Sequence, residues 1–157
     1  QWGIGADDTG PIEIQLEGET PIYRYANGVE VHGCPPPGQP WQQGGACFVG
    51  TDGQITVHRD YLSATPAAIL RRPSSGEGDV YYSTSHGGNF LDCIRTRQRT
   101  ICDAEVAHRG NSVLLLGGIA SRLGRRLRWD PQEERFADDD EANRMLSLAP
   151  REGWRLG

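Results

Sequence analysis

Residues 103–131, DAEVAHRGNSVLLLGGIASRLGRRLRWDP, form the stretch of sequence that decides the predicted fold. Apolar residues recur there at steps of seven, three, four and three, which is the spacing of one face of an α-helix. These residues are Val106, Val113, Leu116, Ala120 and Leu123. Asp103 can accept hydrogen bonds from the first free amides, and Gly124 can end the helix in a left-handed conformation. We therefore expect one long helix between Asp103 and Gly124.

Further apolar residues in this stretch broaden the predicted face. Leu114, Leu115 and Ile119 lie beside the stripe, so we expect the helix to be covered over much of its circumference. After Gly124, residues 127–129 have the pattern of a short strand that ends at a turn. The helix offers enough apolar surface for a sheet to pack on, and we expect the rest of the chain to supply that sheet.

Strand patterns precede this helix. Asn27-Gly28 separates two of them and is a strong hairpin signal, because both residues tolerate positive φ. Thr51-Asp52-Gly53 separates two others in the same way. The predicted strands are residues 12–16, 22–26, 29–34, 46–50, 54–59 and, after Pro66, a short edge strand at 67–71. Together these patterns predict an α+β fold, with a mainly antiparallel open sheet and helices packed on one face.

A second helix is predicted over residues 83–97, with Ser85 or a neighbour as its cap. Its apolar residues are Phe90, Leu91 and Ile94, with Cys93 one face over. Gly87-Gly88 in the first turn costs roughly 1 kcal/mol per glycine relative to alanine, which indicates that a backbone or a ligand comes close. His86 directly precedes this pair. Two interpretations stay open: a solvated or capping histidine, or one that faces a ligand at a helix N-terminus.

A third, small helix is predicted over residues 141–148. The acidic residues 138–140 precede it and fit an N-cap with first-turn charge. A calcium loop would need ligands at alternating positions, a glycine at the sixth and a closing glutamate, and this pattern is absent. Residues 151–154 are expected to form a tail held by Trp154.

Length and composition bound the class of protein. A chain of 157 residues can bury about two-thirds of its unfolded surface, and we expect residues 1–157 to form a single domain. A net charge of -5 argues against a nucleic-acid partner. No apolar run approaches the roughly 20 residues of a membrane span. All 16 basic residues are arginine, so this chain cannot form a lysine Schiff base or complete a P-loop.

Motifs that carry chemistry are scarce. Gly3-Ile4-Gly5 lacks the third glycine and the helix of a dinucleotide fingerprint, and no Gly-x-Ser-x-Gly occurs. Glu105 and His108 are half of a metal motif, which on a helix is usually a first-turn charge beside a surface histidine. The four histidines and four cysteines define no ligand spacing. We therefore expect no catalytic, cofactor-binding or metal-binding residue in this chain.

The sequence opens at Gln1 without a methionine, a charged leader or an apolar signal core. We expect a piece of something longer, or a mature product whose leader is gone. A cytoplasmic location is expected, and export to the periplasm stays open because the leader that would decide is not present.

Several blocks of the sequence resemble the C-terminal half of Gfo/Idh/MocA oxidoreductases. The blocks are HGGNFLDCIR at 86–95, EVAHR at 105–109, LGRRLRWDP at 123–131, DEANR at 140–144 and REGW at 151–154. Residues 1–11 also resemble the segment just after the catalytic aspartate–histidine helix of that family. The resemblance is greatest to a bacterial branch with a Trp-Asp-Pro C-terminal extension, which here would span about residues 129–157.

This resemblance implies an N-terminal Rossmann domain that binds NAD or NADP and lies upstream of Gln1. It implies hydride transfer between the nicotinamide and a carbon of a sugar, polyol or related metabolite. The Glu-Lys-Pro motif and the Asp…His helix of the family also lie upstream. The chain is therefore expected to be the substrate-binding and assembly domain of such an oxidoreductase, and not to be catalytic by itself.

For the residues of this chain, the resemblance implies two roles: they form a wall of the substrate pocket and a surface for assembly. His86 and Asn89, at a helix start beside two glycines, are the candidates for binding the substrate. A homo-oligomer through the open sheet is expected, and missing first strands would leave an exposed sheet edge. The alternative is a stand-alone, non-catalytic module that binds sugar or builds oligomers.

Overall fold

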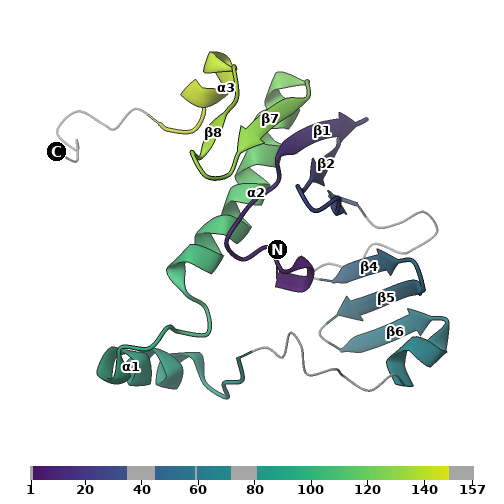
Figure 1. Ribbon diagram of the computed structural model, residues 1–157, viewed down its shortest axis with the longest axis vertical. Helices are drawn as coiled ribbons and strands as arrows, with labels where there is room; N and C mark the ends of the chain where they lie inside the picture. Colours follow the sequence, from purple (N-terminus) through teal and green to yellow (C-terminus); the bar gives the residue numbers. More distant parts are fainter. Residues whose placement is uncertain (1, 35–44, 59, 72–80, 149–157) are drawn as a thin grey trace. The chain divides into compact units, whose positions relative to one another are not determined.

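The fold is described from a computed structural model, which defines residues 2–34, 45–58, 60–71 and 81–148 (Figure 1). The chain groups into two compact units. The first comprises Gln1–Gly33 with Thr96–Gly157, and the second comprises Cys34–Arg95. Each unit is described by itself, and a single domain over residues 1–157 stays a prediction.

The first unit contains a five-stranded sheet in the order β3-β2-β1-β7-β8, antiparallel throughout. Its strands are β1 (Glu13–Glu17), β2 (Thr20–Arg24), β3 (Glu30–His32), β7 (Leu127–Asp130) and β8 (Arg135–Phe136). The hairpin predicted at Asn27-Gly28 is confirmed: Gly28 has φ 85°, and the amide of Tyr25 donates to the carbonyl of Val29 at 2.9 Å. β1 lies between β2 and β7, so the N-terminal strand is internal to the sheet.

The long predicted helix is α2 (Ala104–Leu123), and both of its predicted ends are confirmed. The Asp103 carboxylate accepts from the amides of Glu105 and Val106 at 2.9 and 3.3 Å. Gly124 follows in the left-handed conformation with φ 64°, and its amide donates to the carbonyl of Ala120 at 2.8 Å. Two residues therefore set the length of this helix: Asp103, an acceptor before the first turn, and Gly124, a glycine after the last turn.

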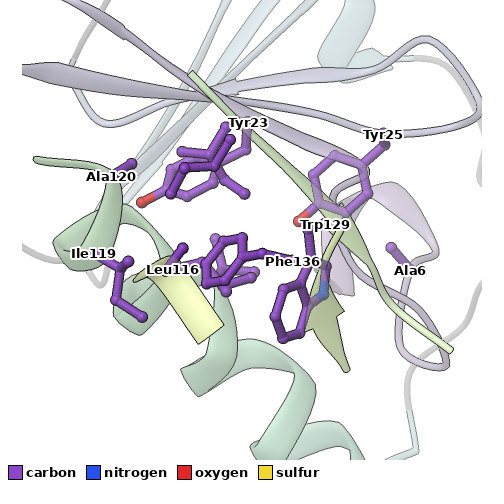
Figure 2. Close-up of a cluster of buried hydrophobic side chains, with 12 residues drawn as sticks. Ala6, Tyr23, Tyr25, Leu116, Ile119, Ala120, Trp129 and Phe136 are labelled. Carbon is purple, nitrogen blue, oxygen red and sulfur yellow. The ribbon is translucent and has the colours of Figure 1, made fainter. Parts of the chain in front are cut away.

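The core of the first unit lies between α2 and the sheet, against β1 and β2 (Figure 2). Its buried side chains include Ile14, Tyr23, Leu116, Ala120, Leu127, Trp129 and Phe136. The rings of Trp129 and Phe136 meet edge to face, with centroids 5.0 Å apart. Gly117 lets the Tyr23 phenol approach the helix backbone, because a Cβ at that position would overlap the hydroxyl and lie 3.0 Å from the ring Cζ.

The prediction that α2 is covered over much of its circumference is wrong. Leu114 and Leu115 are 71% and 61% exposed, whereas Ile119 is 8% exposed. The sheet covers one side of the helix, and no described element of this unit packs on the side that carries the two leucines. An apolar side chain beside a helical stripe is therefore no proof of burial.

The small C-terminal helix, α3 (Asp140–Arg144), is shorter than the predicted range 141–148. Asp139 caps it, since its carboxylate accepts from the amide of Ala142 at 3.0 Å. Arg125 donates to the same carboxylate and to Glu141 at 2.8 Å, which joins the end of α2 to the start of α3. The chain leaves the helix after Met145, and the predicted tail at 151–154 lies outside the described residues.

The second unit contains a three-stranded antiparallel sheet, in the order β4-β5-β6, and the helix α1 (His86–Thr96). The strands are β4 (Ala46–Gly50), β5 (Gly53–His58) and β6 (Tyr61–Thr65). The edge strand predicted at 67–71 is wrong: Ala67–Arg71 forms the 3₁₀-helix η2, in which the amide of Ile69 donates to the carbonyl of Pro66 at 3.1 Å. The third strand of this sheet is instead β6, which the sequence pattern did not reveal.

The predicted α+β class, with antiparallel sheets and helices, is confirmed. The strands divide between two sheets, where the sequence suggested one. A further short 3₁₀-helix, η1 (Trp2–Ile4), opens the described chain. Across the described ranges, no helix combines the length and the apolar character that crossing a membrane requires.

Candidate functional site

A hollow of about 310 Å³ lies at the start of α1, within the second unit. It is lined by residues 81–85, Gly88, Asn89 and Asp92. All of these residues belong to one short stretch of sequence, so the local conformation of the chain is enough to form it. The two predicted substrate-binding residues, His86 and Asn89, belong to the helix at whose start this hollow lies.

Hydrogen bonds from two serines fix the N-terminus of α1. The Ser85 hydroxyl accepts from the amide of Gly88 at 3.1 Å, and the Ser85 carbonyl accepts from the amide of Asn89 at 2.9 Å. The Ser83 hydroxyl accepts from the amide of Ser85 at 3.3 Å. Ser85 is therefore the cap, as the sequence predicted.

One glycine of the pair has a close neighbour within the chain itself. A Cβ on Gly88 would lie 3.2 Å from the Ser85 Oγ, so the close neighbour of this glycine is the capping side chain itself. A Cβ on Gly87 would meet no described atom within 4 Å. The expected close approach of a backbone or a ligand therefore stays a prediction, since the near neighbour of Gly88 is a side chain and Gly87 faces open space.

Asn89 lies in the hollow, held by a hydrogen bond to an aromatic residue. Its Nδ2 donates to the hydroxyl of Tyr81 at 2.6 Å. The same hydroxyl lies 4.0 Å from the Sγ of Cys93, which is 7% exposed and is the buried residue of α1. Tyr81 therefore links the segment before α1 to the first two turns of the helix and orients the Asn89 amide.

His86 is the first residue of α1 and is exposed, but it is not among the residues that line the hollow. The structure thus brings one of the two predicted residues, Asn89, to the hollow and leaves the other at its margin. That either residue binds a substrate stays a prediction.

Sequence reasoning missed Tyr81, Tyr82 and Asp92, which complete the lining. Tyr82 is 83% exposed, and the Asp92 carboxylate pairs with Arg95 at 3.2 Å. Two adjacent aromatic residues before a run of hydroxyl side chains were the available signal, but loop residues carry no periodicity that would place them. Phenol, hydroxyl, amide and carboxylate groups can together donate and accept hydrogen bonds, and an aromatic face can cover the apolar side of a small polar molecule.

The half-motif of Glu105 and His108 does not form a metal site. Glu105 accepts from Arg109 at 2.7 Å, and the Nε2 of His108 lies 2.7 Å from the Oε1 of Glu134. Arg109 also reaches the carbonyl of Pro131 at 2.6 Å, so these groups fasten α2 to the β7–β8 turn. Across the residues that the structure defines, no three potential ligands cluster as a metal ion would require.

Burial shifts the pKa of two tyrosines in the core of the first unit. It raises the pKa of Tyr25 to about 12, with a smaller contribution from the neighbouring Tyr23. Burial also raises the pKa of Tyr23. Both phenols therefore stay neutral at physiological pH and act as packing groups, not as acid–base groups.

One family model matches nearly the whole chain. It is described as the oxidoreductase family, C-terminal alpha/beta domain (GFO_IDH_MocA_C2), and it covers residues 1–156. The chain belongs to the Gfo/Idh/MocA oxidoreductase family. Within this family the match is to the C-terminal domain, in agreement with the resemblance seen in the sequence. Comparison with curated proteins and with solved structures found no match.

The family is generally NAD(P)-dependent, and a bound dinucleotide would need a matching site. A Rossmann site needs parallel strands joined by a helix whose N-terminus meets the pyrophosphate. Every strand pair in the described part of the chain is antiparallel. The described residues therefore do not form a Rossmann-type dinucleotide site.

Proposed function

We propose that this chain is the substrate-binding and assembly domain of an NAD(P)-dependent oxidoreductase that acts on a sugar, a polyol or a related metabolite. It is not catalytic by itself. Its partner is an N-terminal Rossmann domain that binds NAD or NADP. The observation that carries the proposal is the match of residues 1–156 to the C-terminal domain of the family.

The hollow beside α1 supports the ligand class. Its volume of about 310 Å³ is at the lower end of small-molecule sites, which suits a monosaccharide more than a large cofactor. Its lining offers hydroxyl groups, the Asn89 amide and the rings of Tyr81 and Tyr82. A polyhydroxylated ligand needs many short hydrogen bonds of this kind, together with an aromatic face.

The remaining parts of the proposal rest on the resemblance of the sequence to the bacterial branch. Residues 129–157 correspond to the C-terminal extension of the bacterial branch, and the protein forms a homo-oligomer through an open sheet. The proposed compartment is the cytoplasm, which fractionation of cells that produce the complete protein would test.

The deciding experiment compares this chain with the complete protein that contains the N-terminal domain. The complete protein is expected to reduce NAD⁺ or NADP⁺ with a member of a sugar and polyol panel. The chain alone is expected neither to turn over nor to change NADH fluorescence. Clear NADH binding by the chain alone would contradict the proposal. A complete reading frame without a Rossmann domain would favour the alternative, a stand-alone sugar-binding or oligomerisation module.

Substitutions in the complete protein test the hollow. Asn89→Ala is expected to raise KM about tenfold, which corresponds to the loss of one hydrogen bond of about 1.4 kcal/mol. His86→Ala is expected to have a smaller effect, because His86 lies outside the lining. Gln132→Ala, in the exposed turn between β7 and β8, is the control. Equal kinetic constants for the Asn89 and Gln132 variants would remove the hollow as the substrate site.

A further inference from the structure

The turn between β2 and β3 contains the one Asn-Gly pair of the sequence, Asn27-Gly28. Both residues are exposed, and Gly28 has φ 85°. A Cβ at Gly28 would meet no described atom within 4 Å, so no other described segment crowds the residue on that side. The asparagine amide is among the labile groups of proteins, and a following glycine leaves the next peptide nitrogen accessible because it has no side chain.

The reaction open to this pair is deamidation through a cyclic imide. The Gly28 nitrogen loses its proton and attacks the Asn27 Cγ. The N–Cγ bond forms as the Cγ–Nδ2 bond breaks, and the amide group leaves with that proton as ammonia. Water then opens the imide at either carbonyl and yields aspartate or isoaspartate, so water is consumed, ammonia is released and nothing is oxidised. Either product places a new negative charge at position 27.

Two hydrogen bonds of the turn act on this reaction in opposite directions. The Asn27 Oδ1 accepts from the amide of Val29 at 3.1 Å, and this donor would stabilise the negative charge that develops on the oxygen when Cγ is attacked. The Gly28 amide donates to the carbonyl of Tyr25 at 3.0 Å, which keeps its proton away from solvent base. Because the nitrogen must lose this proton, the closed turn is unreactive, and the rate depends on how often the turn opens.

The strand that follows the turn is held by few contacts. β3 has three residues and lies at the end of the sheet order, with β2 as its partner in the described sheet. Val31 is its half-buried residue, and the two others are exposed. The ion pair between Arg24 and Glu30, at 2.9 Å, joins side chains that are 46% and 41% exposed, so it contributes little stability. A short edge strand of this kind opens more often than the whole unit unfolds.

The other three asparagines of the sequence are in a different setting. Asn89, Asn111 and Asn143 lie within α1, α2 and α3 and precede residues with side chains. The Asn143 amide is also engaged at both ends, since its Oδ1 accepts from the amide of Phe136 at 2.8 Å and its Nδ2 donates to the carbonyl of Phe136 at 2.9 Å. These three residues are therefore internal controls for Asn27.

We propose that Asn27 is a modification site, which deamidates in the folded chain while β3 is transiently open. This inference does not depend on the proposed function. Isoaspartate adds a methylene group to the main chain within the turn. The bonds from Gly28 to Tyr25 and from Tyr25 to Val29 then cannot both re-form with their present geometry, and β3 pairs less stably with β2.

Peptide mass spectrometry of the chain, incubated for weeks at neutral pH, tests the inference. Trypsin cleaves after arginine, so Asn27 is recovered in the peptide of residues 25–59. This peptide is expected to gain about 1 Da, with fragment ions that place the gain at position 27. The peptides that contain the three helical asparagines are expected to keep their masses. Equal gains in these peptides would overturn the assignment of the site.

Variants test the dependence on β3. Val31→Ala removes packing of β3 and is expected to speed the gain about fivefold. Glu30→Gln removes the partner of Arg24 and is expected to speed it about twofold. Asp103→Ala is the matched control, because it weakens the cap of α2 and leaves β3 intact, so the rate is expected to stay unchanged.

The contrary outcomes are distinct. A gain that occurs in the urea-unfolded chain and not in the folded chain would overturn the proposal. An equal acceleration by Asp103→Ala and Val31→Ala would show that global unfolding controls the rate, and an unchanged rate in both β3 variants would exclude opening of β3. Thermal melts check that each variant is folded, and Glu30→Gln, an exposed substitution, keeps the test available if Val31→Ala is not.

Discussion

Two adjacent glycines in α2, Gly117 and Gly118, should respond oppositely to the same substitution. Gly117 is buried against the Tyr23 phenol, and an added Cβ would overlap the hydroxyl and lie 3.0 and 3.4 Å from Cζ and Cε1. Gly118 is exposed, and an added Cβ would meet no described atom within 4 Å. The pair therefore separates helix propensity from packing at neighbouring positions.

The magnitudes follow from two effects. Replacing a helical glycine by alanine contributes about 1 kcal/mol of stability at either site. At Gly117 the new methyl group must displace Tyr23, which is 5% exposed and lies in the core, and such overpacking costs about 3 kcal/mol. We expect Gly118→Ala to stabilise the first unit by about 1 kcal/mol and Gly117→Ala to destabilise it by about 2 kcal/mol.

Urea unfolding followed by circular dichroism at 222 nm measures both variants. Combining Gly117→Ala with Tyr23→Phe removes the overlapping hydroxyl and should recover part of the loss, which a double-mutant cycle quantifies. The reasoning is refuted if Gly117→Ala is as stable as Gly118→Ala, or if Tyr23→Phe recovers nothing.

Three further predictions concern caps and titrating groups of the first unit. Asp103→Ala should lower the free energy of unfolding by about 1 kcal/mol, because two amides lose their acceptor, whereas Asp103→Asn should retain most of it in the same urea assay. The pKa of Tyr25 is about 12 when folded and 10.0 when unfolded, so its contribution to stability is complete below pH 10 and is lost as the pH rises from 10 toward 12. In thermal melts, the Tm of Tyr25→Phe should therefore fall less at alkaline pH than that of the unsubstituted chain. An equal fall in Tm would refute this prediction. The hydrogen bond from Arg125, and then the amide of Ala142, lower the pKa of Asp139 below 3.8. Its contribution is therefore present above pH 3.8 and is lost as the pH falls through the lowered folded value, and Arg125→Ala should shift the acid unfolding midpoint upward, with no shift as the contrary result.

The parts of the fold that the sequence predicted well depend on neighbours in the chain. Asp103 and Gly124 set the ends of α2 through hydrogen bonds to residues within four positions, and Asn27-Gly28 forms its turn from its own backbone preferences. Such features are local, so the order of residues contains most of the information that determines them.

The incorrect predictions concern tertiary contacts, that is, which elements pack on or pair with each helix and strand. Leu114 and Leu115 are apolar and yet exposed, because exposure depends on which elements pack on a helix and not on its own periodicity. Residues 67–71 were predicted as a strand, but they form a 3₁₀-helix, because β6 pairs with the edge of β5 that such a strand would have needed. Tertiary pairing overrides weak β propensity in short segments of this kind.

The candidate site shows the same difference between local features, which the sequence predicted, and contacts between segments, which it did not. The sequence predicted a helix over residues 83–97 with Ser85 or a neighbour as its cap; the helix begins at His86, and Ser85 is the cap. It did not show that Asn89 would bond to Tyr81, because that contact depends on the path of an irregular segment before the helix. His86 and Asn89 are three residues apart, but the lining of the hollow includes only the second.

The central place of β1 in its sheet has a consequence for how the protein is made. Glu13 and its partner Arg126 are separated by 113 positions, and β7 takes its place beside β1 only after α2 has been synthesised. A nascent chain on the ribosome can therefore assemble β1, β2 and β3 early but must hold one side of β1 unpaired until β7 has been made. Release of a product truncated before β7 would leave that side available to other nascent chains, so synthesis through β7 protects β1 from misassembly.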